Sequence, residues 1–165
     1  QSTGGRQERN RRGGTENVPA IVGMGVAARV AREALASAGL IAALRDRLET
    51  GILAAVPGTT VNGAADCRVP NTTNLSFDGI EAESLLIALD LEGVAVSTGS
   101  ACSSGTLEPS HVLKAMGLPQ AFARNSLRFS LGPSTTAEEI DFVIGALPRL
   151  VTKLRRLGRT AEALR

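Results

Sequence analysis

The chain has 165 residues and a formal net charge of +2, so it has the size of about one domain and too little excess charge to predict a polyanionic partner. Its aromatic content is only 2%, with neither tryptophan nor tyrosine, which predicts an aliphatic core and argues against a base-stacking surface for single-stranded nucleic acid. Two cysteines and one histidine give neither a disulfide framework nor a plausible metal site. No apolar run approaches the roughly 20 residues of a membrane helix, and the first residues are polar. We therefore expect a cytoplasmic protein that binds neither nucleic acid nor a membrane.

Residues 1–17 are polar and rich in glycine and arginine, which is more typical of a segment that continues from something upstream than of the start of a domain. Their arginines are interrupted by other residues, and this spacing favours a solvated or phosphate-facing loop over a nucleic-acid arm. A glycine pair, Gly13-Gly14, precedes Thr15 and Asn17. The simpler interpretation makes Asn17 the cap of the next helix, and the alternative is that Thr15 and nearby amides receive a phosphate.

Apolar residues then recur at helical intervals. Pro19 begins a predicted amphipathic helix that runs to about Ser37, and Gly39 interrupts it. A second helical segment resumes at Leu40 and ends near the turn dipeptide Pro57-Gly58.

The pattern changes to short strands after this turn. A brief strand is expected at Val61, before the turn Asn62-Gly63, and Asn71 to Phe77 alternates like a strand. Glu81 to Leu91 returns to a helical pattern, which Gly93 ends.

The stretch from Val94 to Gly117 is the most informative part of the chain. Val94 to Ser97 predicts a strand, and a loop of small residues from Thr98 to Thr106 follows, carrying Cys102. Because these neighbours have almost no bulk to pack, we expect the loop to be mobile and its thiol reachable. Pro109 is expected to begin a short helix that ends at Gly117.

The remaining pattern completes a small sheet covered by helices. Asn125 to Leu131 alternates as a third strand, with Leu127, Phe129 and Leu131 on one side and Ser126, Arg128 and Ser130 on the other. Thr136 and Glu139 form a capping box for a final helix, which Pro148 should bend or deprive of a hydrogen bond. We predict an α+β fold with about three strands, antiparallel, covered by helices.

Two side chains stand out chemically. Cys102 is either a nucleophile or an ordinary loop cysteine, and its small neighbours favour the nucleophile. Arg128 is either an outward-facing strand residue or a guanidinium fork that grips a carboxylate with two parallel hydrogen bonds. We interpret His111 as a surface or capping residue and Cys67 as a loop thiol.

These features occur together, and in this order, in a known family. The chain resembles the C-terminal part of the NifS/IscS-like cysteine desulfurases, in the class V aminotransferase superfamily. The matching residues are Gly4 to Arg9, Arg11 to Asn17, Pro70 to Thr72, Asn74 to Phe77, Ser97 to Cys102, Leu107 to Leu113, Leu127 to Gly132, Thr135-Thr136 and Glu138 to Asp141. Thr3 is a departure, because the family usually has a third glycine there.

The resemblance implies a fold and an activity. The fold would be the C-terminal portion of a pyridoxal 5′-phosphate (PLP) enzyme of fold type I, the aspartate-aminotransferase-like class. The activity would convert L-cysteine to L-alanine, with sulfur stored as a persulfide for iron–sulfur cluster or thio-cofactor assembly. By similarity, Cys102 would be the nucleophile and persulfide carrier, Arg128 would bind the substrate carboxylate, and Thr15 would contact the PLP phosphate of the neighbouring subunit of a homodimer.

The same resemblance implies partners. Residues 1–18 would be the end of the large PLP domain, or an interface loop, and residues 19–165 the small domain with its connecting helix. The two lysines, Lys114 and Lys153, do not lie in the family's Ser-x-His-Lys context, so the PLP-binding lysine would come from the large domain, in the same parent chain or a separate one. We expect the chain alone to be inactive, and an iron–sulfur scaffold or other acceptor protein to receive the sulfur.

Other functions are also compatible with these residues. The chain could be a non-enzymatic sulfur-relay or scaffold-docking module that accepts sulfur on Cys102, although a relay needs neither a substrate clamp at Arg128 nor a phosphate contact at Thr15. A parent enzyme acting on selenocysteine or cysteine sulfinate is a weaker alternative, because the Cys102 loop favours cysteine.

Overall fold

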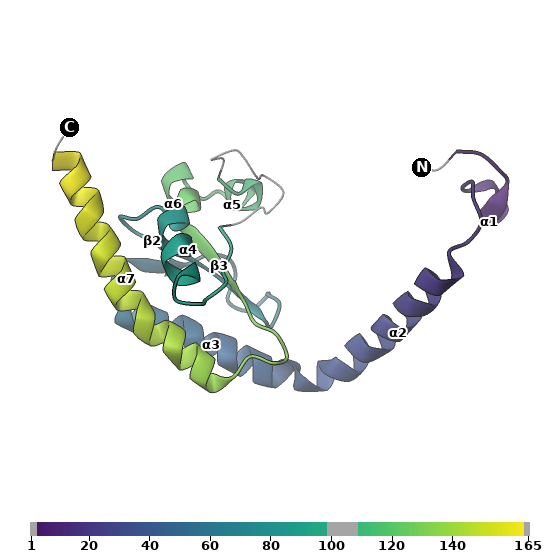
Figure 1. The fold of residues 1–165 in the computed structure, drawn as a ribbon, viewed down its shortest axis with the longest axis horizontal. Coiled ribbons are helices and arrows are strands. Elements are labelled where there is room, and N and C mark those ends of the chain that lie inside the picture. Colours follow the sequence, from purple (N-terminus) through teal and green to yellow (C-terminus); the bar gives the residue numbers. More distant parts are fainter. Residues whose placement is uncertain (1–2, 99–108, 164–165) are drawn as a thin grey trace. The chain divides into compact units, whose positions relative to one another are not determined.

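The computed structural model describes residues 3–98 and 109–163, and its contacts divide the chain into two units, Gln1–Ala36 and Ser37–Arg165 (Figure 1). This division differs from the boundary near residue 18 that the family resemblance implies, since the helix after it belongs to the first unit. Each unit is described by itself.

The first unit consists of a tight polar turn and one long helix. The turn, α1 (Gln7–Asn10), is left-handed, with φ of 49° at Glu8, 55° at Arg9 and 65° at Asn10, a conformation that costs a non-glycine residue about 1–2 kcal/mol. An antiparallel bridge joins Gln7 to Arg12 across its base.

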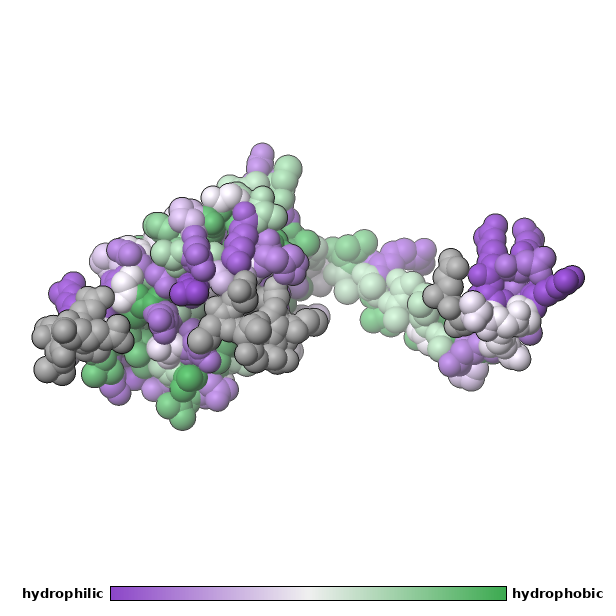
Figure 2. All heavy atoms as spheres, turned by 90° about the horizontal axis from the view of Figure 1, so that it is seen from above, coloured by the Kyte–Doolittle hydropathy of each residue, from purple (hydrophilic) through white to green (hydrophobic). Residues whose placement is uncertain are grey.

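The long helix, α2 (Val18–Ala34), begins as predicted. The Asn17 side chain accepts a hydrogen bond from the Ala20 N–H at 3.1 Å, and Pro19 lies in the first turn. None of its residues is buried. Figure 2 shows apolar side chains at the surface along this helix. They are Val18, Ile21, Val22, Met24, Val26 and Val30.

The break between the two predicted helices lies a few residues before Gly39, where the sequence placed it. A short 3-10 turn, η1 (Leu35–Ser37), breaks the helical run, and Gly39 lies inside the first turn of α3 (Ala38–Ala55). Glycine weakens a helix interior by only about 1 kcal/mol, and the buried side chains Leu48 and Ile52 hold the rest of α3 against the core.

The second unit contains the predicted three-stranded antiparallel sheet, in the order β1 (Thr59–Val61), β2 (Thr72–Phe77), β3 (Ser126–Ser130). Its register places Val61 opposite Leu75, and Leu75 opposite Leu127. The apolar face of the sheet packs against α3, α4 (Ala82–Asp90) and α7 (Ala137–Ala163), and α3 and α7 lie side by side (Figure 1). Fully buried Phe77, Leu85 and Leu147 form the centre of this core.

The opposite face of the sheet is polar and is partly covered by a helix that the sequence pattern did not reveal. This helix, α6 (Gln120–Arg124), has only five residues, too few to show a helical period. The Phe122 carbonyl accepts hydrogen bonds from the hydroxyls of Ser126, at 2.7 Å, and Ser76, at 3.3 Å. Ser126 is therefore fully buried, although it lies on the polar face.

Two predictions near residue 100 need correction. Val94–Ser97 is not a ladder strand, because the segment makes a single bridge, from Ser97 to Arg128. The short helix α5 (His111–Ala115) begins two residues after Pro109, with Ser110 as its N-cap. Its end agrees with the prediction, since Gly117 has a φ of +84°.

The last helix, α7, begins with the predicted capping box. The Thr136 N–H donates to the Glu139 carboxylate at 2.9 Å, and the Glu139 N–H donates to the Thr136 hydroxyl at 3.2 Å. The helix continues through Pro148, and the Thr152 hydroxyl donates to the Pro148 carbonyl at 2.7 Å. Throughout residues 3–98 and 109–163, the helices are all too short or too polar to cross a membrane.

Candidate functional site

Arg128 lies on β3 between two buried neighbours, Leu127 and Phe129, and its own side chain is exposed. Because side chains alternate along a strand, the neighbours enter the core and the guanidinium points to the polar face. No described residue forms a hydrogen bond or an ion pair with this guanidinium. A cation in this position is able to bind an anion from outside the chain.

Ser97 is held directly beside Arg128 by a pair of backbone hydrogen bonds. The Arg128 N–H donates to the Ser97 carbonyl at 2.7 Å, and the Ser97 N–H donates to the Arg128 carbonyl at 3.2 Å. Val94 and Val96 are half-buried and pack against the core, so the chain that leads to Ser97 is also held in place. The sequence pattern predicted this segment but did not single out Ser97.

Cys102, the predicted nucleophile, lies outside the described residues, but both ends of its segment are described. One end is the Ser97 bridge. At the other end Pro109 and Ser110 are buried, and the Ser110 hydroxyl accepts from the Leu113 N–H at 3.5 Å. The segment with Cys102 therefore starts and finishes on structured parts of the second unit.

Thr15 is exposed, in the first unit, between the turn Gly13-Gly14 and the start of α2. The Arg12 guanidinium donates to the carbonyls of Gly13 and Gly14 at 3.2 and 2.5 Å, and it lies 3.3 Å from the Glu16 carboxylate. These contacts hold the turn that presents Thr15. Its hydroxyl has no hydrogen-bond partner in the described part of the unit, so it is a donor suited to a phosphate oxygen, as the PLP interpretation requires.

The other reactive side chains lie on the surface. His111 and Lys114 are exposed on α5, and Lys153 is exposed on α7. Cys67 lies in a loop, as the sequence predicted, and is an exposed free thiol. Neither lysine lines the cavity described next.

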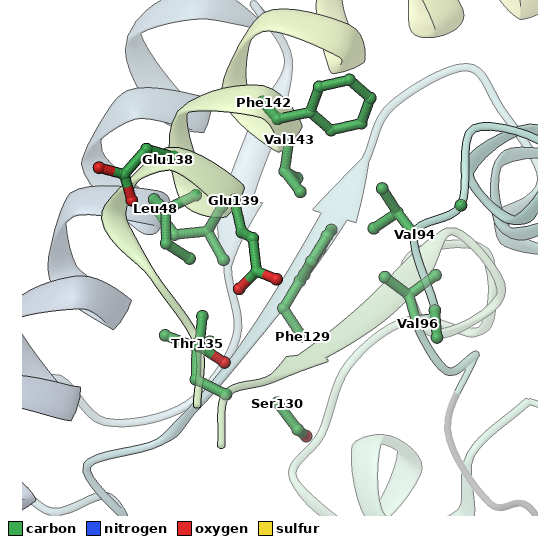
Figure 3. A pocket seen from close by; sticks show the side chains of 14 residues that line it. Leu48, Val94, Val96, Phe129, Ser130, Thr135, Glu138, Glu139, Phe142 and Val143 are labelled. Carbon is green, nitrogen blue, oxygen red and sulfur yellow. The ribbon is translucent and has the colours of Figure 1, made fainter. Parts of the chain in front are cut away.

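A cavity of about 500 Å³ lies between β3, residues 93–96 and the start of α7 (Figure 3). Its wall is mostly apolar, with Val94, Val96 and Phe129 facing the opening and the carboxylates of Glu138 and Glu139 on one side. Hydrogen bonds from the Glu138 backbone N–H and then from Thr136 lower the pKa of the Glu138 carboxyl. Arg128 does not line this cavity, although its neighbours on β3 do. Nothing in the sequence pattern predicted this cavity.

A charged cluster holds the connection between β1 and β2 in place. The Arg68 guanidinium donates to both oxygens of the Glu49 carboxylate, at 2.6 and 2.9 Å, and the Thr73 hydroxyl donates to the same carboxylate at 2.5 Å. The bond from Arg68 is the main reason that the pKa of Glu49 is lowered. This cluster joins α3 to β2 and so supports the strand next to Arg128.

The fold is thus an α+β domain with an antiparallel three-stranded sheet, and the polar face of this sheet carries Arg128 beside Ser97, where the Cys102 segment begins. Comparison with known proteins identifies its family: residues 1–143 match the model of the class V aminotransferases, and the chain belongs to that family.

Relatives with this sequence pattern are cysteine desulfurases. The chain is 51% identical over 156 residues to the cysteine desulfurase NifS of Azotobacter vinelandii and 51% identical over 155 residues to cysteine desulfurase 2 of Trichormus variabilis. Each alignment covers 94% of this chain and 39% of the relative, so the chain spans about two-fifths of the length of these proteins.

Solved structures agree with this fold. A NifS-like protein superposes with a TM-score of 0.76 at 34% identity, over 92% of this chain and 38% of the other. DndA from Streptomyces lividans superposes with a TM-score of 0.56 at 42% identity, over 77% of this chain and 35% of the other.

Proposed function

We propose that the chain is the C-terminal portion of a cysteine desulfurase, which converts L-cysteine to L-alanine with PLP and keeps the sulfur as a persulfide on Cys102. The observation that carries the proposal is the pairing of Ser97 with Arg128, because it joins the base of the Cys102 segment to an exposed guanidinium suited to bind an amino-acid carboxylate. Five peptide units separate Ser97 from Cys102, so the two Cα atoms are no more than about 18 Å apart. The thiol thus remains within reach of a substrate bound at Arg128.

Arg128 holds the substrate in this proposal. Its guanidinium binds both oxygens of the L-cysteine carboxylate, which fixes the orientation of the substrate as well as its position. Lysine would supply the charge without the planar fork.

Cys102 acts as the nucleophile. Its thiolate forms an S–S bond to the substrate sulfur while the C–S bond of the substrate breaks. The electron pair of that bond stays on carbon, which takes up a proton to give L-alanine, and the enzyme keeps a persulfide. PLP, when bound, supplies the electron sink for this cleavage.

In this proposal, most of the cofactor site lies outside this chain, which contributes Thr15 to it. Thr15 would hold the PLP phosphate of the neighbouring subunit of a homodimer through its hydroxyl, and a lysine of the large domain would supply the covalent attachment of the cofactor. The exposed apolar side chains of α2 support a large-domain partner, because a helix with such a surface ordinarily packs against another element. The chain alone therefore has no desulfurase activity. In the cytoplasm, the persulfide sulfur passes to an iron–sulfur scaffold or another acceptor protein.

The test measures alanine release and protein persulfide from L-cysteine and PLP. The chain alone should give neither product, and the chain assembled with the large domain of a cysteine desulfurase should give both. Cys102→Ala should abolish both in the assembly, whereas Cys67→Ala, the matched control at the exposed free thiol, should leave both unchanged. Turnover by the chain alone, or full activity of Cys102→Ala, would refute the proposal.

A relay module would behave differently in the same experiment. It would accept sulfur on Cys102 from a separate, complete desulfurase and would give no alanine after assembly with a large domain. That pattern would favour the non-enzymatic function over the enzymatic one.

A further inference from the structure

Four polar residues form one row across the sheet of the second unit. Ser97 pairs with Arg128, Arg128 lies opposite Asn74 in the register of β2 and β3, and Asn62 continues the register of β1. The Asn62 backbone N–H donates to the Asn74 backbone carbonyl at 2.8 Å, so Asn62 is the last residue of this row.

These side chains lie on the same face. Residues directly opposite one another in antiparallel strands point the same way, and the preceding or following residues, such as Val61, Leu75 and Leu127, belong to the core on the other face. Both backbone groups of Arg128 bond to Ser97, so Arg128 and Asn74 form a non-hydrogen-bonded pair. Such pairs have Cα atoms about 4.5 Å apart and close side chains. The Asn74 amide is therefore the cross-strand neighbour of the Arg128 guanidinium.

The Asn74 amide is oriented by Asn62. The Asn62 Nδ2 group donates to the Asn74 Oδ1 atom at 2.7 Å, and the same group contacts the hydroxyls of Ser76 at 2.8 Å and Ser126 at 3.0 Å. The Asn74 oxygen is thus occupied, and no described residue accepts a hydrogen bond from its NH₂ group. Asn74 is only half-buried, so this group is accessible from the polar face.

We propose that Asn74, oriented by Asn62, is a second donor to the carboxylate of the amino acid that Arg128 binds. A carboxylate has about four acceptor sites, and a bidentate guanidinium occupies two of them. A neutral amide donor beside the guanidinium adds a hydrogen bond to the charged group and also restricts rotation of the carboxylate. This inference rests on the proposed function, because it takes Arg128 as the carboxylate-binding residue.

The test uses the assembled desulfurase and measures KM and kcat for L-cysteine, with the dissociation constant of L-alanine from titration calorimetry as a second readout. Asn74→Ala should raise KM and the L-alanine dissociation constant roughly tenfold, as expected for the loss of a hydrogen bond to a charged group, and should change kcat less than about twofold. The isosteric Asn74→Asp should raise both constants further, since its carboxylate competes for Arg128. Ser130→Ala is the matched control, because Ser130 is exposed on the same strand and face, two residues from Arg128.

The outcomes separate this inference from the proposed function. If Arg128→Ala raises KM while Asn74→Ala and Asn74→Asp leave KM and alanine binding unchanged, the role of Asn74 is refuted and the Arg128 clamp stands. If Arg128→Ala leaves both constants unchanged, the proposed carboxylate site itself is refuted. A lower melting temperature and lower kcat in the Asn74 variants, with unchanged alanine binding, would show a structural role and overturn the inference.

Discussion

Glu49→Gln should destabilise the second unit by about 2 kcal/mol at neutral pH. The wild-type carboxylate accepts two hydrogen bonds from Arg68, and only 14% of the Glu49 side chain and 18% of the Arg68 side chain are exposed. Removing one partner of a fully buried ion pair costs about 3–5 kcal/mol, and the remaining exposure here reduces that value. The Arg68 Nε group is already buried without a hydrogen-bond partner in the described residues. The more exposed Asp46 carboxylate, 3.6 Å from the same guanidinium, compensates only part of the loss.

The effect should depend on pH with a definite sign. In the folded protein the pKa of Glu49 is lowered from 4.5, chiefly by the hydrogen bond from Arg68. Burial of the carboxyl opposes this shift, and the hydrogen bond from Thr73 adds to it. A carboxyl with a lowered folded pKa contributes stability above its unfolded pKa and loses that contribution as the pH falls through the folded value. The difference between wild type and Glu49→Gln should therefore be complete at neutral pH and shrink below pH 4.5.

Urea unfolding measures the free energy of unfolding of wild type and Glu49→Gln. The transition is followed by far-ultraviolet circular dichroism, because the chain has no tryptophan or tyrosine for intrinsic fluorescence. In a thermal scan the same change corresponds to about 6–8 °C in Tm. Glu83→Gln is the control, because Glu83 is an exposed glutamate on α4 without a hydrogen-bond partner in the described structure, and it should change the free energy of unfolding by less than about 0.5 kcal/mol. Equal stability of wild type and Glu49→Gln at neutral pH, or a difference that does not shrink as the pH falls below 4.5, would contradict the reasoning.

Three further substitutions test the fold by the same unfolding assay. Leu147→Ala should cost about 2–5 kcal/mol, because Leu147 is fully buried, and a loss below about 1 kcal/mol would place it outside the core. Thr136→Ala should cost about 1 kcal/mol by removing half of the capping box, and an unchanged free energy would show that the box contributes nothing. Gly93→Ala should cost about 1 kcal/mol from its φ of +80° alone, since an added Cβ meets no atom within 4 Å, so a much larger loss would indicate a steric clash instead.

The strands and long helices of the second unit could be predicted because their burial follows their sequence period. Leu127 and Phe129 alternate with Arg128 in β3, and the core residues of α7 recur every three or four positions, so one side of each element had to face the interior. Helix α7 also runs through Pro148, where local propensity favours a break, because buried Leu147 and Leu150 flank the proline and pack into the core.

The errors arose where tertiary contacts decide the structure. The β-branched run Val94–Ser97 resembles a strand, yet only Ser97 pairs with β3, because Val94 and Val96 instead contribute to the core and the cavity wall. In α2 the helical period correctly predicted an amphipathic helix, and none of its residues is buried. Of the candidate site, Arg128 and Thr15 were singled out from the sequence, and their roles stay predictions. The pairing of Asn74 with Arg128 depends on strand register, which a single sequence does not define.

The Ser97 bridge and the Ser110 cap fix the two ends of the Cys102 segment independently of its length. Insertions or deletions between them would leave the sheet, Arg128 and α5 in place, because doubling the number of residues in a loop costs only about 0.6 kcal/mol of closure free energy. If Cys102 carries the sulfur as proposed, a change in the length of this segment would alter the range over which the sulfur is delivered while leaving Arg128 in place.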